Sequence, residues 1–288
     1  MLKIMLATDF SERSDRALRR AVLLARESGA SIELVHVIDD DRPRSIVDHE
    51  AADAATLLGD LARSLESTDQ ISCRTHILLA DPFAGIAKAV EDVRPDLLVI
   101  GPHRRQILKD AFIGTTAERT IRVASCPVLM VNGPPVGPYQ KVLLTTDLSD
   151  GAGEALQQFE SLQMSPRSHL SVVHVFVAPA LRLAMSGTVP KDDQEEYLNG
   201  QRAQARRELA QFMTGIGGWR AEQIVRHEKS PVALEILKTA VDQRSDLIVV
   251  STQNKGAVAR MLIGSVTEQV LRSAPVDVLA IPPRQADS

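Results

Sequence analysis

The stretch Pro95-Asp96-Leu97-Leu98-Val99-Ile100-Gly101 decides the fold, because the chain repeats it 150 residues later as Ser245-Asp246-Leu247-Ile248-Val249-Val250-Ser251. A second matching stretch follows in each copy, Phe112-Ile113-Gly114-Thr115-Thr116-Ala117-Glu118-Arg119 and Leu262-Ile263-Gly264-Ser265-Val266-Thr267-Glu268-Gln269. An apolar strand, a loop and a Gly-Thr or Gly-Ser step that opens a helix are typical of an anion site, because helix N-termini attract negative charge. The sequence therefore predicts a duplicated domain with a candidate ligand site in each copy.

The duplication extends back to the start of the chain. Residues 4–11 (IMLATDFS) match 142–149 (VLLTTDLS), and residues 34–37 (LVHV) match 172–175 (VVHV). The offset is 138 residues here and 150 residues later, so the second copy carries about a dozen extra residues between its second and fourth strands. Near-continuous Val, Ile and Leu runs favour strands that helices cover on both faces, as in parallel sheets.

Strands alternate with helical patterns along both copies. Helices are expected at 11–28, 48–66, 82–93 and 115–123, and strands at 71–80, 97–100 and 127–131, with a last strand of the second copy at 276–281. This alternation predicts an α/β fold of two tandem doubly wound, Rossmann-like domains, each a five-stranded parallel sheet flanked by helices. The expected boundaries are 1–133 for the first domain, 134–139 for a Pro/Gly linker and 140–288 for the second. The last strands are natural edges, and we expect them to pair with each other.

Composition narrows the classes of function. The 288 residues carry a net charge of −4 and only 3% are aromatic, so nothing favours nucleic acid or a membrane surface as a partner. Cys73 and Cys126 lack metal-ligand spacing and are expected to be buried free thiols, and no metal site is predicted. With no membrane-spanning run and no leader before the first strand, the expected compartment is the cytoplasm.

Two aspartates are candidate ligand-binding residues. Asp9 and Asp147 each follow the first strand of a copy, at the sheet edge where ligands lie in open parallel sheets. Their carboxylates could bind ribose hydroxyls, an adenine amine or magnesium, or they could serve only as helix N-terminal carboxylates. His36 and His174 also recur, but the chain has no nucleophile motif. We expect hydrogen-bonded core histidines and predict no catalytic residue.

Several short motifs occur in a fixed order and spacing. They are Thr8-Asp9-Phe10-Ser11, His36-Val37, the strand ending Val99-Ile100-Gly101-Pro102-His103, Gly114-Thr115 with Ala117-Glu118-Arg119 following, and Ser125-Cys126-Pro127-Val128-Leu129. Together they resemble the universal stress protein family in its tandem two-domain form, over nearly the whole chain. The resemblance implies an adenine nucleotide alpha hydrolase-like fold, a role in stress survival, and ATP binding in some members.

The resemblance also implies where a nucleotide would bind. The ATP-binding pattern of the family is Gly, two residues, Gly, nine residues, Gly, then Ser or Thr. These positions hold Gly101, Arg104, Gly114 and Thr115 in the first copy, and Ser251, Asn254, Gly264 and Ser265 in the second. Base and ribose contacts of the family fall on Asp9, Val37, Asp147 and Val175. The predicted nucleotide-binding residues are Thr8, Asp9, Val37, Ile100, Gly101, Arg104, Gly114, Thr115, Thr116, Asp147, Val175, Gly264, Ser265 and Val266.

The phosphate loops depart from the family pattern. Arg104 stands where a glycine is expected, and it could either close the loop by its bulk or pair with phosphate oxygens bidentately. Asn254 restricts the backbone less than Arg104, because Asn tolerates left-handed conformations. Lys255 beside it could supply positive charge. The first copy is favoured as the nucleotide site because it retains Gly101.

Three functions follow from these observations. The leading hypothesis is a cytoplasmic stress-response regulator that senses ATP or another adenine nucleotide, with magnesium as a candidate companion and any ATP hydrolysis slow and incidental. The second is a nucleotide-free protein–protein interaction module, and the third is a slow ATP-hydrolysing or adenylating enzyme. The expected partners are the nucleotide and a regulatory protein of unknown identity. The two halves are expected to form an intramolecular pseudo-dimer, and a further homodimer stays open.

Overall fold

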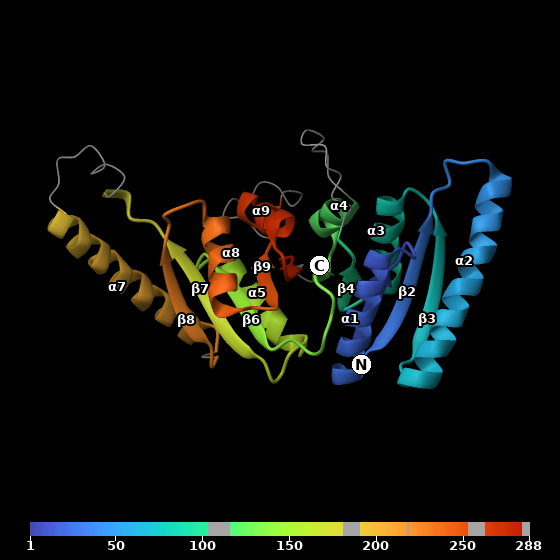
Figure 1. Ribbon diagram of the computed structural model, residues 1–288, viewed down its shortest axis with the longest axis horizontal. Helices are drawn as coiled ribbons and strands as arrows, with labels where there is room; N and C mark the ends of the chain where they lie inside the picture. The colour runs from blue at the N-terminus through green and yellow to red at the C-terminus, as the bar shows by residue number, and fades with distance from the viewer. Residues whose placement is uncertain (103–115, 181–190, 218, 253–262, 284–288) are drawn as a thin grey trace.

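The computed structural model describes residues 1–102, 116–180, 191–217, 219–252 and 263–283. The described strands form one continuous ten-stranded sheet with helices on both faces (Figure 1). The strands of the first half are β1 (Lys3–Ala7), β2 (Ser31–Ile38), β3 (Cys73–Leu79), β4 (Leu97–Ile100) and β5 (Val128–Met130). Those of the second half are β6 (Lys141–Thr146), β7 (His169–Phe176), β8 (Glu222–His227), β9 (Leu247–Ser251) and β10 (Asp277–Ile281).

The strand order shows how the halves are joined. It runs β3-β2-β1-β4-β5-β10-β9-β6-β7-β8, and all pairs within a half are parallel. The exception is the pair at the centre, where β5 and β10 run antiparallel with Leu129 opposite Leu279. The predicted fold, with two five-stranded parallel sheets joined through their last strands, is therefore confirmed.

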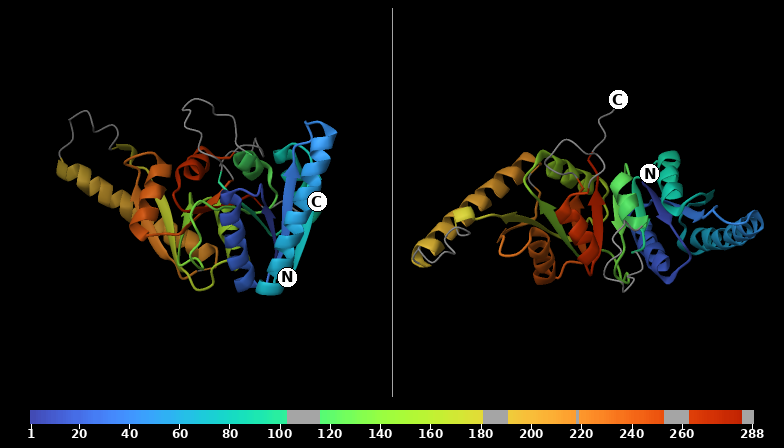
Figure 2. Two further views of the ribbon diagram at one scale, coloured as in Figure 1. Left: turned by 45° about the vertical axis from the view of Figure 1, so that its right-hand side comes forward. Right: turned by 90° about the horizontal axis from the view of Figure 1, so that it is seen from above.

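Helices cover both faces of the sheet. In the first half, α1 (Glu12–Ser28) and α2 (Arg44–Ser64) pack on one face, and α3 (Pro82–Val93) and α4 (Thr116–Val123) on the other. In the second half the corresponding helices are α5 (Asp150–Ser161) with α7 (Lys191–Gly215), and α8 (Val232–Gln243) with α9 (Ser265–Ser273). Figure 2 shows these layers from two further directions, with α2 and α7 at the far ends of the molecule.

The alternation of side chains along β1 explains the two layers. Ile4 and Leu6 are buried in the core under α1 and α2, whereas Met5 between them is buried in the core under α3 and α4. Successive side chains of a strand point to opposite faces, so a fully apolar run must be covered on both sides. Each of the two cores continues across β5 and β10 into the second half.

The second helix differs from its predicted bounds. The second helix begins at Arg44 rather than at 48, and its end continues into a π-helical turn, Leu65–Asp69, rather than stopping at 66. In its first turn Val47 is buried and the neighbouring Ile46 is exposed, so these two adjacent apolar residues do not form the repeating pattern that reveals a helix start. The extra residues of the second copy fall between β7 and β8, the segment that contains the 25-residue helix α7.

The two cysteines are buried and unpaired, as predicted. Burial raises the pKa of the Cys73 thiol to about 12, with help from the negative charges of Glu66 and Glu33. Burial likewise raises the pKa of Cys126 to about 12. Both thiols are therefore protonated and poorly nucleophilic at neutral pH. Separately, none of the helices in the described ranges combines the length and apolar character needed to cross a membrane.

A buried ion pair ties the halves together next to β5 and β10. The Asp277 carboxylate accepts hydrogen bonds from Arg20 Nε at 3.1 Å and from the Tyr139 hydroxyl at 2.6 Å. It also accepts the backbone N–H groups of Asn132 and Gly133, at 2.9 and 3.1 Å. The Arg20 guanidinium lies 3.9 Å from the centre of the Tyr139 ring. One carboxylate thus connects β10 to α1, to the linker and to the chain after β5.

A second contact crosses the centre of the molecule on the opposite face. The helices α4 and α9 lie side by side there (Figures 1 and 2), and Arg272 Nε donates to Glu118 Oε1 at 3.1 Å. The hydrogen bond that Arg272 donates to Glu118 raises the pKa of Arg272. The halves are therefore held on both faces of the sheet as well as through it.

We expect the variant Asp277→Ala to lower the free energy of unfolding by about 3–5 kcal/mol, because it leaves the buried Arg20 guanidinium without its counter-charge. Urea denaturation followed by circular dichroism measures the change. Asp92→Ala is the matched control, since it breaks an exposed pair with Lys88 and should cost less than about 1 kcal/mol. Equal losses for both variants would contradict the role assigned to Asp277.

Candidate functional site

Among the residues that the structure describes, a ligand-sized cavity lies at the carboxyl edge of the parallel strands in each half. The first pocket, of about 410 Å³, is lined by the predicted residues Thr8, Asp9, Val37, Ile100, Gly101 and Thr116. The second pocket, of about 480 Å³, is lined by the predicted residues Asp147, Val175, Gly264, Ser265 and Val266. Both volumes fall in the range of about 300–1,000 Å³ that is usual for small-molecule sites. The predicted residues Arg104, Gly114 and Thr115 lie outside the described residues.

A tight turn after β1 presents Asp9 to the first pocket. Phe10 adopts a left-handed backbone (φ 56°), and its N–H donates to the Thr8 hydroxyl at 3.1 Å. The Asp9 carboxylate accepts the Ser11 N–H at 3.0 Å, and Ser11 in turn caps the N-terminus of α1 by accepting the Ser14 N–H. The turn therefore fixes both the start of α1 and the position of the carboxylate.

The second half repeats this turn after β6. Leu148 has a left-handed backbone (φ 64°), and its N–H donates to the Thr146 hydroxyl at 2.9 Å. Asp147 accepts the Ser149 N–H at 3.0 Å, and Ser149 caps α5 by accepting the Ala152 N–H. In both copies the aspartate therefore has the role of a carboxylate at the N-terminus of a helix, which was the alternative to ligand binding that the sequence left open. Both carboxylates nevertheless also line a cavity, so that role does not exclude ligand binding.

The environment of Asp9 favours its charged form. Burial raises its pKa, but the hydroxyl and N–H of Ser11, the Ser14 hydroxyl and the charge of Arg13 outweigh burial and lower the pKa below the usual value. Since the folded pKa is depressed, the group stabilises the protein above the pKa of the unfolded chain and loses that contribution as pH falls through the folded pKa. At neutral pH the first pocket therefore presents a full carboxylate.

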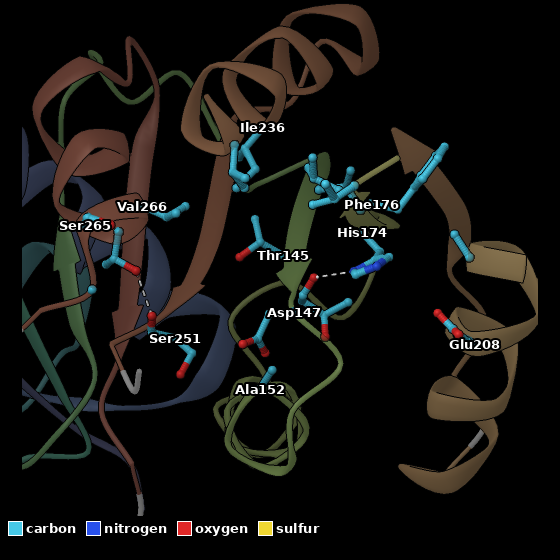
Figure 3. A pocket seen from close by; sticks show the side chains of 18 of the residues that line it. Thr145, Asp147, Ala152, His174, Phe176, Glu208, Ile236, Ser251, Ser265 and Val266 are labelled. Carbon is cyan, nitrogen blue, oxygen red and sulfur yellow. Dashed lines mark hydrogen bonds between the residues drawn. The ribbon is translucent and has the colours of Figure 1, made fainter. Parts of the chain in front are cut away.

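The recurring histidines are hydrogen-bonded to the backbone of these turns. His36 Nδ1 lies 2.8 Å from the Thr8 carbonyl oxygen, and His174 Nδ1 lies 3.1 Å from the Thr146 carbonyl oxygen (Figure 3). The Phe10 ring lies against His36 with the ring centres 4.5 Å apart. The predicted hydrogen bonds of the histidines are thus confirmed, but both side chains are only partly buried rather than part of the core, and they support the Thr-Asp turns.

Close helix packing accounts for part of the glycine pattern. A Cβ on Gly101 would lie 3.0 Å from the carbonyl oxygen of Arg13 in the first turn of α1. Ser251 occupies the equivalent place at the end of β9, and Gly151 stands where the first copy has Arg13. Gly101 therefore allows α1 to approach the end of β4, and its presence alone does not indicate a phosphate.

The sequence missed one wall of the second pocket. Gln201, Gln204, Ala205 and Glu208 of α7 line it, and Figure 3 shows Glu208 across the cavity from Asp147. No residue of α2, the corresponding helix, lines the first pocket among the residues described. The spacing of three, four and seven residues places these side chains on one helix face. Helical periodicity in this polar stretch could therefore have indicated the helix wall from the sequence.

The chemistry available is that of recognition. The first pocket combines a carboxylate, the hydroxyls of Thr8 and Thr116, and apolar surface from Val37 and Ile86. Among the described residues, no group of three or more His, Cys, Asp or Glu side chains could hold a metal ion. This arrangement suits a small molecule with both polar hydroxyls and an apolar face.

A ligand-sized cavity in each half of a continuous sheet defines the chain as a tandem, doubly wound α/β protein with two candidate ligand sites. The family model described as "Universal stress protein family" matches residues 1–132 and 138–282. The chain therefore belongs to the universal stress protein family.

Individual relatives agree with this assignment. A universal stress protein of Mycolicibacterium smegmatis is 24% identical over 314 residues, covering 98% of this chain and 97% of that protein. One from Methanocaldococcus jannaschii is 28% identical over 143 residues, covering 46% of this chain and 82% of that protein. The crystal structure of a universal stress protein from Archaeoglobus fulgidus matches with a TM-score of 0.72 at 21% identity, covers 98% of both chains, and shows the same fold.

We expect Gly101→Ala to lower the free energy of unfolding by about 1–3 kcal/mol, because its Cβ would force α1 away from the end of β4. Gly59→Ala is the matched control: Gly59 lies inside α2, and the position that a Cβ would take there has no neighbouring atom within 4 Å, so alanine should stabilise by about 0.5–1 kcal/mol. Urea denaturation distinguishes the two. A neutral Gly101→Ala would contradict the close approach.

Proposed function

We propose that this universal stress protein binds ATP or another adenine nucleotide in the first pocket and acts as a cytoplasmic stress-response regulator. The carrying observation is that Asp9, Val37, Gly101 and Thr116 line a single cavity of about 410 Å³. An ionised carboxylate suits ribose hydroxyls, and the apolar wall suits a purine. Thr116 is the first residue of α4, and the N-terminus of a helix favours phosphate groups.

The preference for the first pocket rests on the end of the strand beside α1. Gly101 keeps that backbone free of a side chain, whereas Ser251 occupies the equivalent place in the second half. The second pocket remains a candidate site through Asp147, Val175 and the start of α9, where Gly264, Ser265 and Val266 lie.

Binding rather than catalysis is the proposed role of the pocket. His36, a conceivable base, is engaged through Nδ1 with the Thr8 carbonyl oxygen. Among the described lining residues, the first pocket offers hydroxyls and one carboxylate but no histidine or cysteine. Magnesium would accompany the phosphates, and a regulatory protein would read the nucleotide-bound state. A nucleotide-free interaction module is the alternative.

Titration calorimetry with ATP and ADP, with and without magnesium, tests the proposal directly. A nucleotide present at about 100 times its Kd should stabilise the folded state by about 2.7 kcal/mol, which a thermal shift detects. Mass spectrometry of small molecules released from the purified protein provides an independent readout. No heat, no thermal shift at millimolar nucleotide and no released nucleotide would favour the interaction module instead.

The duplication supplies a matched pair of variants. We expect Asp9→Ala to weaken nucleotide binding about tenfold or more, because it removes a charged hydrogen-bond acceptor from the first pocket. Asp147→Ala removes the same turn contact from the second half and should leave the affinity within about twofold. Calorimetry on both variants locates the site. The reverse order of effects would assign the nucleotide to the second pocket.

A further inference from the structure

We propose that Arg13 is a phosphate-binding cation of the first pocket and makes that pocket selective for phosphorylated ligands, a feature that the described residues of the second pocket lack. The inference rests on the proposed function, since it concerns the same pocket. It adds a residue that lies outside the glycine pattern of the family, on the first turn of α1 rather than in the loop after β4.

Arg13 lines the first pocket near the end of β4 and the start of α4. Arg13 lines the first pocket together with Gly101, Pro102 and Thr116. Its backbone carbonyl lies beside Gly101, where a Cβ would come within 3.0 Å. The first turn of α1 is thus packed against the end of β4. The guanidinium itself lies 3.8 Å from the Asp9 carboxylate, which lines the same cavity as the first residue of α4, the helix whose start favours an anion.

The present partner of Arg13 is weakly held. Among the described residues its ion-pair partner is Asp9, with 3.8 Å between Arg13 Nη2 and Asp9 Oδ2, and 34% of the Arg13 side chain and 64% of the Asp9 side chain are exposed. Exposed pairs at this distance contribute little to stability. A phosphate offers the guanidinium fork a bidentate acceptor, so the exchange favours the ligand. It also leaves Asp9 available to hydroxyl groups.

The charge of Arg13 also offsets the repulsion between the Asp9 carboxylate and a bound phosphate. A phosphate that enters this cavity shares it with the ionised Asp9 carboxylate, and two negative groups at close range repel each other. Arg13, four residues after Asp9 and in the first turn of α1, can neutralise both. Arg13 is the only cationic side chain among the described residues that line the pocket, so its loss should favour an uncharged ligand such as a nucleoside over a phosphorylated one.

The second pocket shows what the fold looks like without this residue. Gly151 stands at the position of Arg13, with the same turn before it. The described residues lining that pocket include the carboxylates of Asp147 and Glu208 and no lysine or arginine. The two pockets therefore share the turn that places the aspartate and differ in the cation beside it.

None of the other four arginines of α1 lines the first pocket, and two of them pair with acidic residues on the same helix. Arg16 pairs with Glu12 at 3.2 Å, and Arg19 pairs with Asp15 at 2.8 Å, both on the outer surface of the helix. Neither residue lines the first pocket. Arg16 has a similar exposed fraction to Arg13, 36%, so Arg16→Gln is a matched control for loss of one positive charge on the same helix.

The test compares four probes by titration calorimetry: ATP, AMP, adenosine and tripolyphosphate, each with the full chain. For Arg13→Gln we expect affinity for ATP and tripolyphosphate to fall about tenfold or more, while affinity for adenosine changes less than twofold. Arg13→Lys should recover part of the loss, and Arg16→Gln should change nothing. The dependence of ATP affinity on salt should also weaken in Arg13→Gln.

Each result decides one question. Equal weakening of adenosine and ATP by Arg13→Gln would make Arg13 a structural residue and overturn the inference, as would equal effects of Arg13→Gln and Arg16→Gln. If the wild-type protein binds tripolyphosphate through Arg13 but not adenosine, the inference stands and the adenine-nucleotide function fails. If the wild-type protein binds none of the four probes, both proposals are wrong.

Discussion

The buried carboxylate of Asp277 is the constraint on which the rest of the molecule depends. A buried charge is tolerated only when it is paired and hydrogen-bonded, and its donors come from α1, the linker and the chain after β5. Shifting β10 along β5 would leave Arg20 and several N–H groups without partners. The register with Leu129 opposite Leu279 is therefore fixed, and both pockets are built on one rigid sheet.

The strands and their order follow from the sequence because their signals are local. Apolar runs mark buried parallel strands, and a constant offset identifies the duplication, so even the pairing of the last strands was predictable. The contacts of the pockets were less accessible, because they depend on which helix packs near which strand end. Nothing near Gly101 in the sequence indicates that Arg13 lies beside it, and the polar residues of α7, such as Glu208, read as an ordinary solvent-facing surface.

The two halves separate what the fold requires from what a ligand requires. The Thr-Asp turn, the left-handed residue after it and the serine cap are kept in both, because they set the start of the helix that follows β1 or β6. The aspartate and valine that line each cavity are also kept, but other lining residues have diverged. Arg13 corresponds to Gly151, and the wall that α7 gives the second pocket, including Glu208, has no counterpart from α2 among the described residues.

Because one chain supplies both β5 and β10, their antiparallel contact persists at low protein concentration. Two separate chains joined by such an edge would come apart on dilution, because the stability of a dimer depends on protomer concentration. Here the linker joins both partners, so their association is unimolecular and independent of expression level. Both clefts are therefore present in every molecule, in a one-to-one ratio, from the first copy synthesised.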